Sequence, residues 1–434
     1  MNQHRRWTAL LALGSAAALM ISGCSTAGGG SSSGGGGDKT VITFGTTDDP
    51  AVNEAEQEII DNFTAENPDI TVQFEKVAFA DYDTKLTTEL RAGTGPDVFR
   101  VNHPNVQLWA GAGYLADLTD AMADIDTSNF VPGLLSIGGV DGTFYALPID
   151  TGNRALWYNP KLLESVGVTE PPSTWAELLD TVGKFKDNAD VYGYCFVTNS
   201  DYAMAYETVG PYMAQAGGVI LSDATPPQAI AATEEATVAA VTLLQDIAKT
   251  GEIPPGSANM DSDTRSALFA GGQCALMIGG TWERPVIEAD NPDAVFGEDY
   301  AVAVVPTREA GQESGTTGGG WMLGVNAESK QAEAAAKFFA FYAKSESLKL
   351  LSGSDTFPPL LDGMDGEPYA GDPFFEPFRE MLPNTVLPIV PVPQMAEVSA
   401  EFEAAVRGAV NDGKDVVTQL TNFDTKVNEQ VLTQ

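Results

Sequence analysis

The sequence predicts an α/β protein built from two lobes. Segments typical of strands alternate with segments typical of helices over most of the 434-residue chain, and this alternation favours mostly parallel sheets joined by right-handed crossovers. The chain is 43% hydrophobic, with 20 Phe, 12 Tyr and 6 Trp, which is enough apolar material for a packed core. About 395 residues follow the N-terminal leader, more than one hydrophobic core usually organises, so two lobes are expected.

The alternation begins just after a glycine-rich stretch. The predicted strands of this first part are β-branched or alternating runs at 39–49, 70–77 and 96–102. The predicted helices are 53–68, with apolar residues at helical spacing, and 82–93, which Gly93 would close.

The later part repeats the pattern. Its predicted strands are 191–199, 274–280 and 300–307. Its predicted helices are 233–251, the amphipathic segment 327–351, and 398–413 with Gly413 as C-cap. Thr174, before Trp175 and Glu177, predicts a further helix start.

Charge and residue counts exclude several functions. The chain has 60 acidic and 23 basic residues, a formal net charge of -37, so its surface repels nucleic-acid phosphates and anionic lipid headgroups. We interpret this charge as a solubility device; a cationic ligand is the alternative. With three cysteines and two histidines in the whole chain, no zinc site of the usual kind can be assembled. We expect no metal and no cofactor.

The N-terminus has the pattern of an export signal. Residues 1–23 combine a basic start with an apolar stretch too short for a comfortable membrane span. The segment ISGC (21–24) resembles the lipobox of bacterial lipoproteins, in which the cysteine carries diacylglycerol, although that motif prefers Leu where Ile21 stands. This resemblance makes Cys24 the expected lipidation site, and 24–38 would be the acylated cysteine with a flexible Gly/Ser linker. An ordinary secretory signal is the alternative.

Several stretches, in order along the chain, resemble one family. They are LRAGTGPDVFRVN (90–102), GTFYALPIDTGNRALWYNPKLLESVGVTEPPSTWAELL (142–179), LFAGGQCALMIGGTWE (268–283) and TTGGGWMLGVNAESKQAEAAAKFFAFY (316–342). They are similar to segments of bacterial extracellular solute-binding proteins of the maltose-binding type, which serve ATP-driven (ABC) importers. The similarity runs from about Val41 to the C-terminus.

The resemblance implies a two-lobed periplasmic-binding-protein fold (type II-like) with a ligand cleft between the lobes. The first lobe would comprise 39–150 plus 308–357 and the second 151–307 plus 358–434. Hinge closure would trap an extracellular carbohydrate, and the permease subunits of the importer would receive it. We therefore expect a monomeric binding protein rather than an enzyme. It would be held at the outer face of the cell membrane by its lipid.

Candidate ligand-binding residues follow from the chemistry of sugars. Sugars present flat faces of C–H bonds and rims of hydroxyl groups, so their sites pair aromatic rings with planar polar groups. Residues of these kinds at strand ends and in the resembling segments are Thr47, Asp48, Asn102, His103, Asp150, Asn153, Asn199, Asp201, Trp282, Glu283, Gly320, Trp321 and Arg379. Turn or capping roles are the alternative for the polar residues, and core packing for Trp282. Arg154 could instead pair with Asp150.

Two cysteines remain after Cys24. Cys195 and Cys274 both lie in predicted strands of the second lobe. Outside the cytoplasm they would form a structural disulfide if their Cα atoms come within about 7 Å; two free thiols are the alternative.

Two other functions stay open. One is a secreted glycosidase that uses two carboxylates, but 60 acidic residues make coincidental pairs certain and therefore uninformative. The sequence has no GxSxG, HExxH or P-loop motif. The other is a surface lipoprotein with no role in transport.

Overall fold

The computed structural model describes residues 39–433 except 124, 141, 189, 199–203, 225, 352–355, 388–391 and 393. Residues 39–434 form one compact unit. The predicted signal peptide, Cys24 and the linker lie outside the described residues, as do Asn199 and Asp201.

The first sheet has five strands in the order β2-β1-β3-β12-β6. They are β1 (Thr40–Thr47), β2 (Ile70–Val77), β3 (Val98–Asn102), β6 (Ala146–Pro148) and β12 (Trp321–Val325). β1 is parallel to β2 and β3, whereas β12 runs antiparallel to β3 and β6. A strand from late in the chain therefore completes a sheet begun by the first hundred or so residues.

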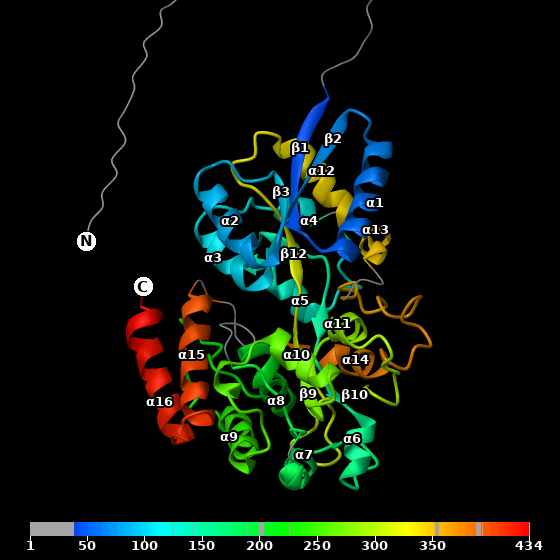
Figure 1. Ribbon diagram of the computed structural model, residues 1–434. Coiled ribbons are helices and arrows are strands. Elements are labelled where there is room, and N and C mark those ends of the chain that lie inside the picture. The colour runs from blue at the N-terminus through cyan, green and yellow to red at the C-terminus, as the bar shows by residue number, and fades with distance from the viewer. Residues whose placement is uncertain are drawn as a thin grey trace, which may run out of the picture. The chain divides into compact units, whose positions relative to one another are not determined.

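Helices cover both faces of this sheet. On one face lie α1 (Pro50–Glu66), α12 (Ala332–Tyr342) and α13 (Ser345–Leu350); on the other lie α2 (Phe79–Arg91) and α3 (Val106–Gly111) (Figure 1). Phe44 of β1 packs edge-on against Phe338 and Tyr342 of α12, with ring centroids 5.5 and 5.9 Å apart. Burial of such large aromatic side chains is the main stabilising contribution to this core.

The second sheet has three strands in the order β10-β8-β9. They are β8 (Ala155–Tyr158), β9 (Leu276–Gly279) and β10 (Ala301–Ala303), and all pairings are antiparallel. The prediction of mostly parallel sheets is thus wrong for this part. The helices of this part are α6 (Pro160–Ser165), α7 (Trp175–Gly183), α8 (Gly210–Ala216), α9 (Glu235–Thr250), α10 (Ser262–Ala270), α11 (Glu283–Asp290), α14 (Glu376–Met381), α15 (Met395–Val410) and α16 (Val416–Lys426).

Local signals account for several helix ends. Thr174 caps α7 by accepting a hydrogen bond from Glu177 N (3.2 Å), and the Glu177 carboxylate accepts one from the N–H of Ser173, the residue before the cap (2.9 Å), an arrangement close to a capping box. α9 ends at Gly251, which has φ +81°. The predicted helix 327–351 is instead two helices, because Lys344 takes an extended backbone conformation between α12 and α13. α15 ends at Val410, earlier than the predicted Gly413.

The predicted strand at 191–199 is not a strand over its described residues, 191–198. Tyr192 and Cys195 form isolated bridges to Cys274 and Met277. Between them, the backbone N–H groups of Gly193 and Tyr194 both donate to Glu252 O, outside the sheet. The ladder is therefore interrupted although the segment is apolar and buried.

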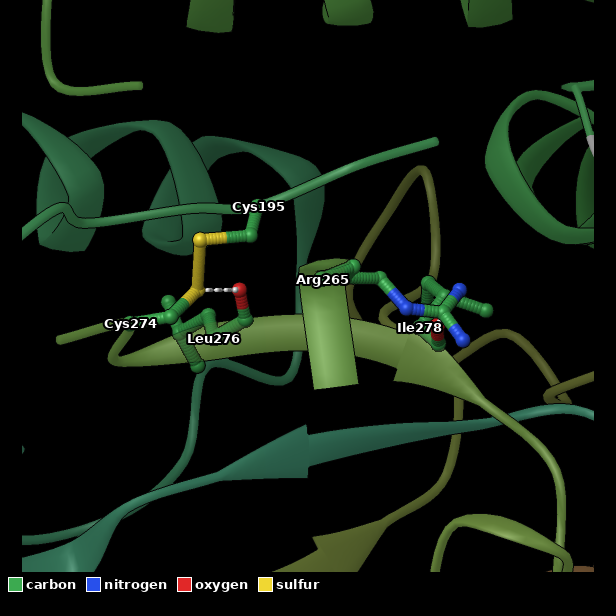
Figure 2. The surroundings of a disulfide bond; sticks show 5 residues. All are labelled: Cys195, Arg265, Cys274, Leu276 and Ile278. Carbon is green, nitrogen blue, oxygen red and sulfur yellow. Dashed lines mark hydrogen bonds between the residues drawn. A yellow bond between two sulfur atoms is a disulfide. The ribbon is translucent and has the colours of Figure 1, made fainter. Parts of the chain in front are cut away.

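The two remaining cysteines are joined in a disulfide, with Cα atoms 6.1 Å apart. Cys195 comes from the irregular segment and Cys274 from just before β9, and both are fully buried (Figure 2). The bond ties this segment to the second sheet. Nearby, Arg265 Nη1 donates to Ile278 O of β9 at 2.9 Å.

Short strands carry the chain between the two sheets. β7 (Gly152–Asn153) follows β6 and precedes β8, while β11 (Thr316–Gly319) precedes β12. β11 pairs antiparallel with β7 and parallel with β13 (Thr385–Val386). Thr151 also bridges to Phe357.

Among the described residues, no helix has the length and apolar character needed to span a membrane.

Candidate ligand-binding site

The chain leaves the first sheet after β6 and returns to it between β11 and β12, and Asp150 joins these two crossings. This buried residue follows β6, and Gly320 separates β11 from β12. The Asp150 carboxylate accepts hydrogen bonds from Trp321 N (Oδ1, 2.6 Å) and from Arg100 Nη2 (Oδ2, 2.6 Å). A Cβ atom at Gly320 would lie 2.3 Å from Asp150 O, so only glycine allows this close approach of the two crossings.

Arg100 is the partner of Asp150 that sequence reasoning missed. The expectation that Arg154 could pair with Asp150 is wrong, since Arg100 of β3 makes this ion pair. Arg100 is buried, lies 3.8 Å from the Glu56 carboxylate, and stacks its guanidinium 4.6 Å over the Trp321 ring. A charged residue inside the apolar run VFRVN was the available signal, because an arginine in a buried strand needs a carboxylate partner.

Burial changes the protonation of this group. It raises the pKa of Glu56 to about 7, although Arg100 and hydrogen bonds from Tyr342 and Asn53 oppose the shift. Burial likewise raises the pKa of Asp150, against the opposing charge of Arg100. Desolvation disfavours the charged carboxylates, so the single arginine only partly compensates the two of them.

His103 lies directly beside this crossing. It opens the short 3-10 helix η1 (His103–Asn105), and its Nδ1 is 3.2 Å from Gly320 O and 3.3 Å from Gly320 N. Burial and the charge of Arg154 lower the pKa of His103 to about 3, so the imidazole is neutral at physiological pH. Its ring meets Tyr206, from the π-helix η3 (Met204–Thr208), edge-on with centroids 5.3 Å apart.

Trp282 follows β9 of the second sheet and lies beside Arg154. It stands between β9 and α11 and is half-buried, so it is not a core residue. The Arg154 guanidinium stacks 4.9 Å over its ring. A Cβ atom at Gly280 would lie 2.1 Å from two of its ring carbons, so the indole fits only against a bare glycine.

Residues 48–349 match the family of bacterial extracellular solute-binding proteins. The chain belongs to this family. The family prediction is thereby confirmed, and membership implies solute binding outside the cytoplasm.

Named relatives agree with this solute-binding assignment. The chain is 26% identical to a maltotriose-binding protein of Pyrococcus abyssi, over 86% of this chain and 78% of the relative. It is 29% identical to the diacetylchitobiose binding protein DasA of Streptomyces coelicolor, over 62% of this chain and 61% of the relative.

Solved structures show the fold of this solute-binding protein. An ABC transporter solute-binding protein of Thermotoga lettingae, bound to α-D-tagatose, is 25% identical with a TM-score of 0.76, covering 90% of this chain and 99% of the other. The sugar-binding protein MalE of Xanthomonas citri is 20% identical with a TM-score of 0.77, covering 91% and 98%. The predicted two-lobed α/β binding-protein fold is confirmed.

Not all predicted ligand residues of this solute-binding protein converge. Direct contacts join Asp150, His103, Gly320 and Trp321. Asn102 pairs with Trp321 across β3 and β12. Thr47 ends β1, where its carbonyl accepts from Asn53 Nδ2 at 2.8 Å, and the neighbouring Asp48 is exposed.

Three predicted residues make hydrogen bonds or ion pairs within the protein. Asn153 Nδ2 donates to Phe378 O and Thr385 Oγ1 at 2.9 and 3.1 Å. Glu283 is buried and accepts from Arg265 and Ser266. Arg379 donates to Met364 O and Tyr369 O and pairs with Glu376. These contacts give each of them a role in holding loops and helices, so we do not carry them into the proposed site.

Two hollows of the described surface lie away from these residues. One of about 260 Å³ is lined by residues of α10 and α11, among them Phe269 and Ile287. Another, of about 590 Å³, surrounds Gly311 and Glu313. No candidate ligand residue lines either of these two.

Proposed function

We propose that this protein captures an extracellular carbohydrate between its two lobes and delivers it to the permease of an ABC importer. The observation that carries the proposal is the cluster at the chain crossings. Asp150, His103 and Trp321 extend from the first sheet, and Trp282 with Arg154 from the second. Two half-buried indoles beside planar polar groups match the flat faces and hydroxyl rims of sugars.

The relatives support carbohydrate as the ligand class. Their names and titles give maltotriose, diacetylchitobiose and galactooligosaccharide, and the structures hold α-D-tagatose, ribitol or D-mannitol. All are polyhydroxylated and uncharged. A neutral ligand also suits a chain of formal charge -37, which repels anions.

The sheets support the predicted lobe boundaries. We assign 39–150 plus 308–357 to the first lobe and 151–307 plus 358–434 to the second. β12 completes the first sheet, and β8, β9 and β10 make the second. The lobes would close by bending at the crossings near Asp150 and Gly320, which absorb the change in backbone angles.

The N-terminal residues support a membrane tether. We propose that Cys24 carries diacylglycerol and that the Gly/Ser linker up to residue 38 joins it to a monomeric body. This would hold the protein at the outer face of the cell membrane, close to the importer.

Calorimetric titration of the mature chain tests the function. The panel comprises maltotriose, diacetylchitobiose, a galactooligosaccharide, tagatose, ribitol and mannitol. We expect at least one to bind, and at about 100 times its Kd to add about 2.7 kcal/mol to the free energy of unfolding. Trp282→Leu should weaken that binding about tenfold or more. If no member binds, the carbohydrate assignment is wrong; hydrolysis of a chromogenic glycoside beyond stoichiometry would favour the glycosidase instead.

A further inference from the structure

A closed chain of contacts surrounds Trp282. The guanidinium of Arg154 lies over its ring, and Arg154 Nη2 is 4.0 Å from Glu207 Oε1. Arg265 Nη1 donates to the other oxygen of Glu207 at 3.0 Å, and Arg265 also pairs with Glu283. Glu283 follows Trp282 directly in the chain, so the contacts return to their starting point.

This ring of contacts is buried and balanced in charge. Arg154 is 4% exposed, Glu207 8%, and Arg265 and Glu283 1% each. Two arginines face two carboxylates, so removing one charge leaves another uncompensated in a dry environment. The ring joins four segments of the second lobe: β7–β8, η3, α10 and α11.

Arg154 itself is held in place. Its Nη1 donates to Gly152 O at 3.1 Å. Gly152 touches the same indole, because a Cβ atom there would lie 3.0 Å from Trp282 Cζ3. Gly152 and Arg154, two positions apart, therefore both lie against the tryptophan. A planar guanidinium is suited to such stacking, and an ammonium group is not.

We propose that Arg154 is a positioning residue, which holds the Trp282 indole in the orientation that binds carbohydrate, while Glu207 and Arg265 hold Arg154. The proposal rests on the proposed function for its binding consequence. It assigns a role to an arginine that does not pair with Asp150 and that lies outside the predicted set of ligand residues. Arg154 Nε has no acceptor among the described residues, so direct contact with the sugar is the competing explanation.

A double-mutant cycle separates the two explanations. We compare Arg154→Met in the native background and in Trp282→Leu, by calorimetric titration with the tightest-binding sugar of the panel. In the native background affinity should fall about 3- to 30-fold, the range of a desolvated cation–π contact. In Trp282→Leu the same change should alter affinity less than about twofold. Equal losses in both backgrounds, or no loss in the native one, would overturn the proposal.

Two further variants serve this cycle. Arg154→Lys keeps the charge beside Glu207 but loses the planar stack, so it should show an intermediate loss and remains usable if Arg154→Met does not fold. Arg284→Met is the matched control, because Arg284 stacks 4.8 Å over Phe374, a ring outside the proposed site. It should leave the sugar affinity within about twofold of the parent, since it removes a similar contact elsewhere.

A readout without sugar tests the positioning alone. We expect Arg154→Met to increase the quenching of tryptophan fluorescence by acrylamide. In the Trp282→Phe background the same change should have no effect on quenching. If the panel fails and this quenching difference persists, the proposed function is wrong and the positioning role stands. If quenching is the same in Arg154→Met and the parent, the positioning role is wrong whatever the panel shows.

Discussion

Glu56, Arg100 and Asp150 form a buried charged group whose net charge depends on pH. One arginine serves two carboxylates, at 3.8 and 2.6 Å. Burial raises the pKa of Glu56 to about 7, so near neutral pH this residue is partly protonated and the group is close to balanced. The shorter contact belongs to Asp150, which also accepts from Trp321 N. The crossing is thus held by the shorter of the two ion pairs.

Glu56 and His103 contribute to stability with opposite dependence on pH. The pKa of Glu56 rises from 4.5 to about 7 on folding, so its contribution is present below 4.5 and is lost as pH rises through about 7. The pKa of His103 falls from 6.5 to about 3, because burial and Arg154 keep the ring neutral. Its contribution is present above 6.5 and is lost as pH falls toward 3.

Glu56→Gln should expose the His103 contribution. Between pH 4.5 and 6.5 the two groups oppose each other in the native chain. Without Glu56, the free energy of unfolding should rise with pH more steeply than in the parent, by up to about 1.4 kcal/mol per pH unit. Urea unfolding at a series of pH values measures the slopes, and His103→Asn should change the slope in the opposite direction. Parallel curves for Glu56→Gln and the parent would contradict the expectation.

Which candidate residues could be found from sequence depended on their place in the strands. Asp150, His103 and Trp321 stand at strand ends, where polar or aromatic residues attract attention, and the structure brings them into contact. Arg100 lies within a strand, and its partner depends on β12 lying between β3 and β6. No local pattern encodes that order, so the Arg100–Asp150 pair was out of reach.

At the scale of elements, local sequence patterns predicted which helices and strands form better than they predicted where each begins and ends. Alternation located β2 at 70–77, as the structure has it. The helix predicted at 327–351 has an apolar pattern that continues past Lys344, but the backbone breaks there. The apolar segment at 191–198 is almost as buried as a strand, yet the N–H groups of Gly193 and Tyr194 donate to Glu252 O outside the sheet. Periodicity reports burial and leaves the hydrogen-bond partner undetermined.

The disulfide should contribute strongly to the second lobe. Cys195 and Cys274 are 79 residues apart, and closing a loop of that length removes much entropy from the unfolded chain. The double variant Cys195→Ala, Cys274→Ala should lose about 2 to 5 kcal/mol of unfolding free energy. Urea unfolding measures the loss; an unchanged midpoint and slope would contradict it.

Burial of the same bond provides the control. Cys195 and Cys274 are fully buried in the folded protein, so a mild reductant should leave the native disulfide intact. Reductant added in urea should break it and lower refolding stability to that of the double variant. Thiol counting under the two conditions distinguishes a structural bond from an accessible one.

At the scale of the whole molecule, fold class was predictable but strand direction was not. Alternating patterns indicated α/β structure, and the length indicated two lobes. The return of β12 to the first sheet was implied by family resemblance rather than by periodicity. The second sheet contradicts the parallel expectation, because β8 pairs antiparallel with both β9 and β10 although helices separate these strands along the chain. Alternation of strands and helices therefore does not determine strand direction.

Charge and the proposed tether together predict where the protein resides. A chain of formal charge -37 is repelled by anionic lipid headgroups, so its charge does not favour staying at a membrane. The proposed lipid at Cys24 would then account for retention. Cys24→Ala should therefore release the protein into the medium or periplasm, with its sugar affinity within about twofold of the parent, because the predicted Gly/Ser linker would separate the tether from the fold. As a control, Ser25→Ala changes the neighbouring residue and should leave the protein in the membrane fraction. Membrane fractionation with a high-salt wash, followed by titration of the released protein, measures both properties; a Cys24→Ala protein that stays with the membrane would refute the anchor.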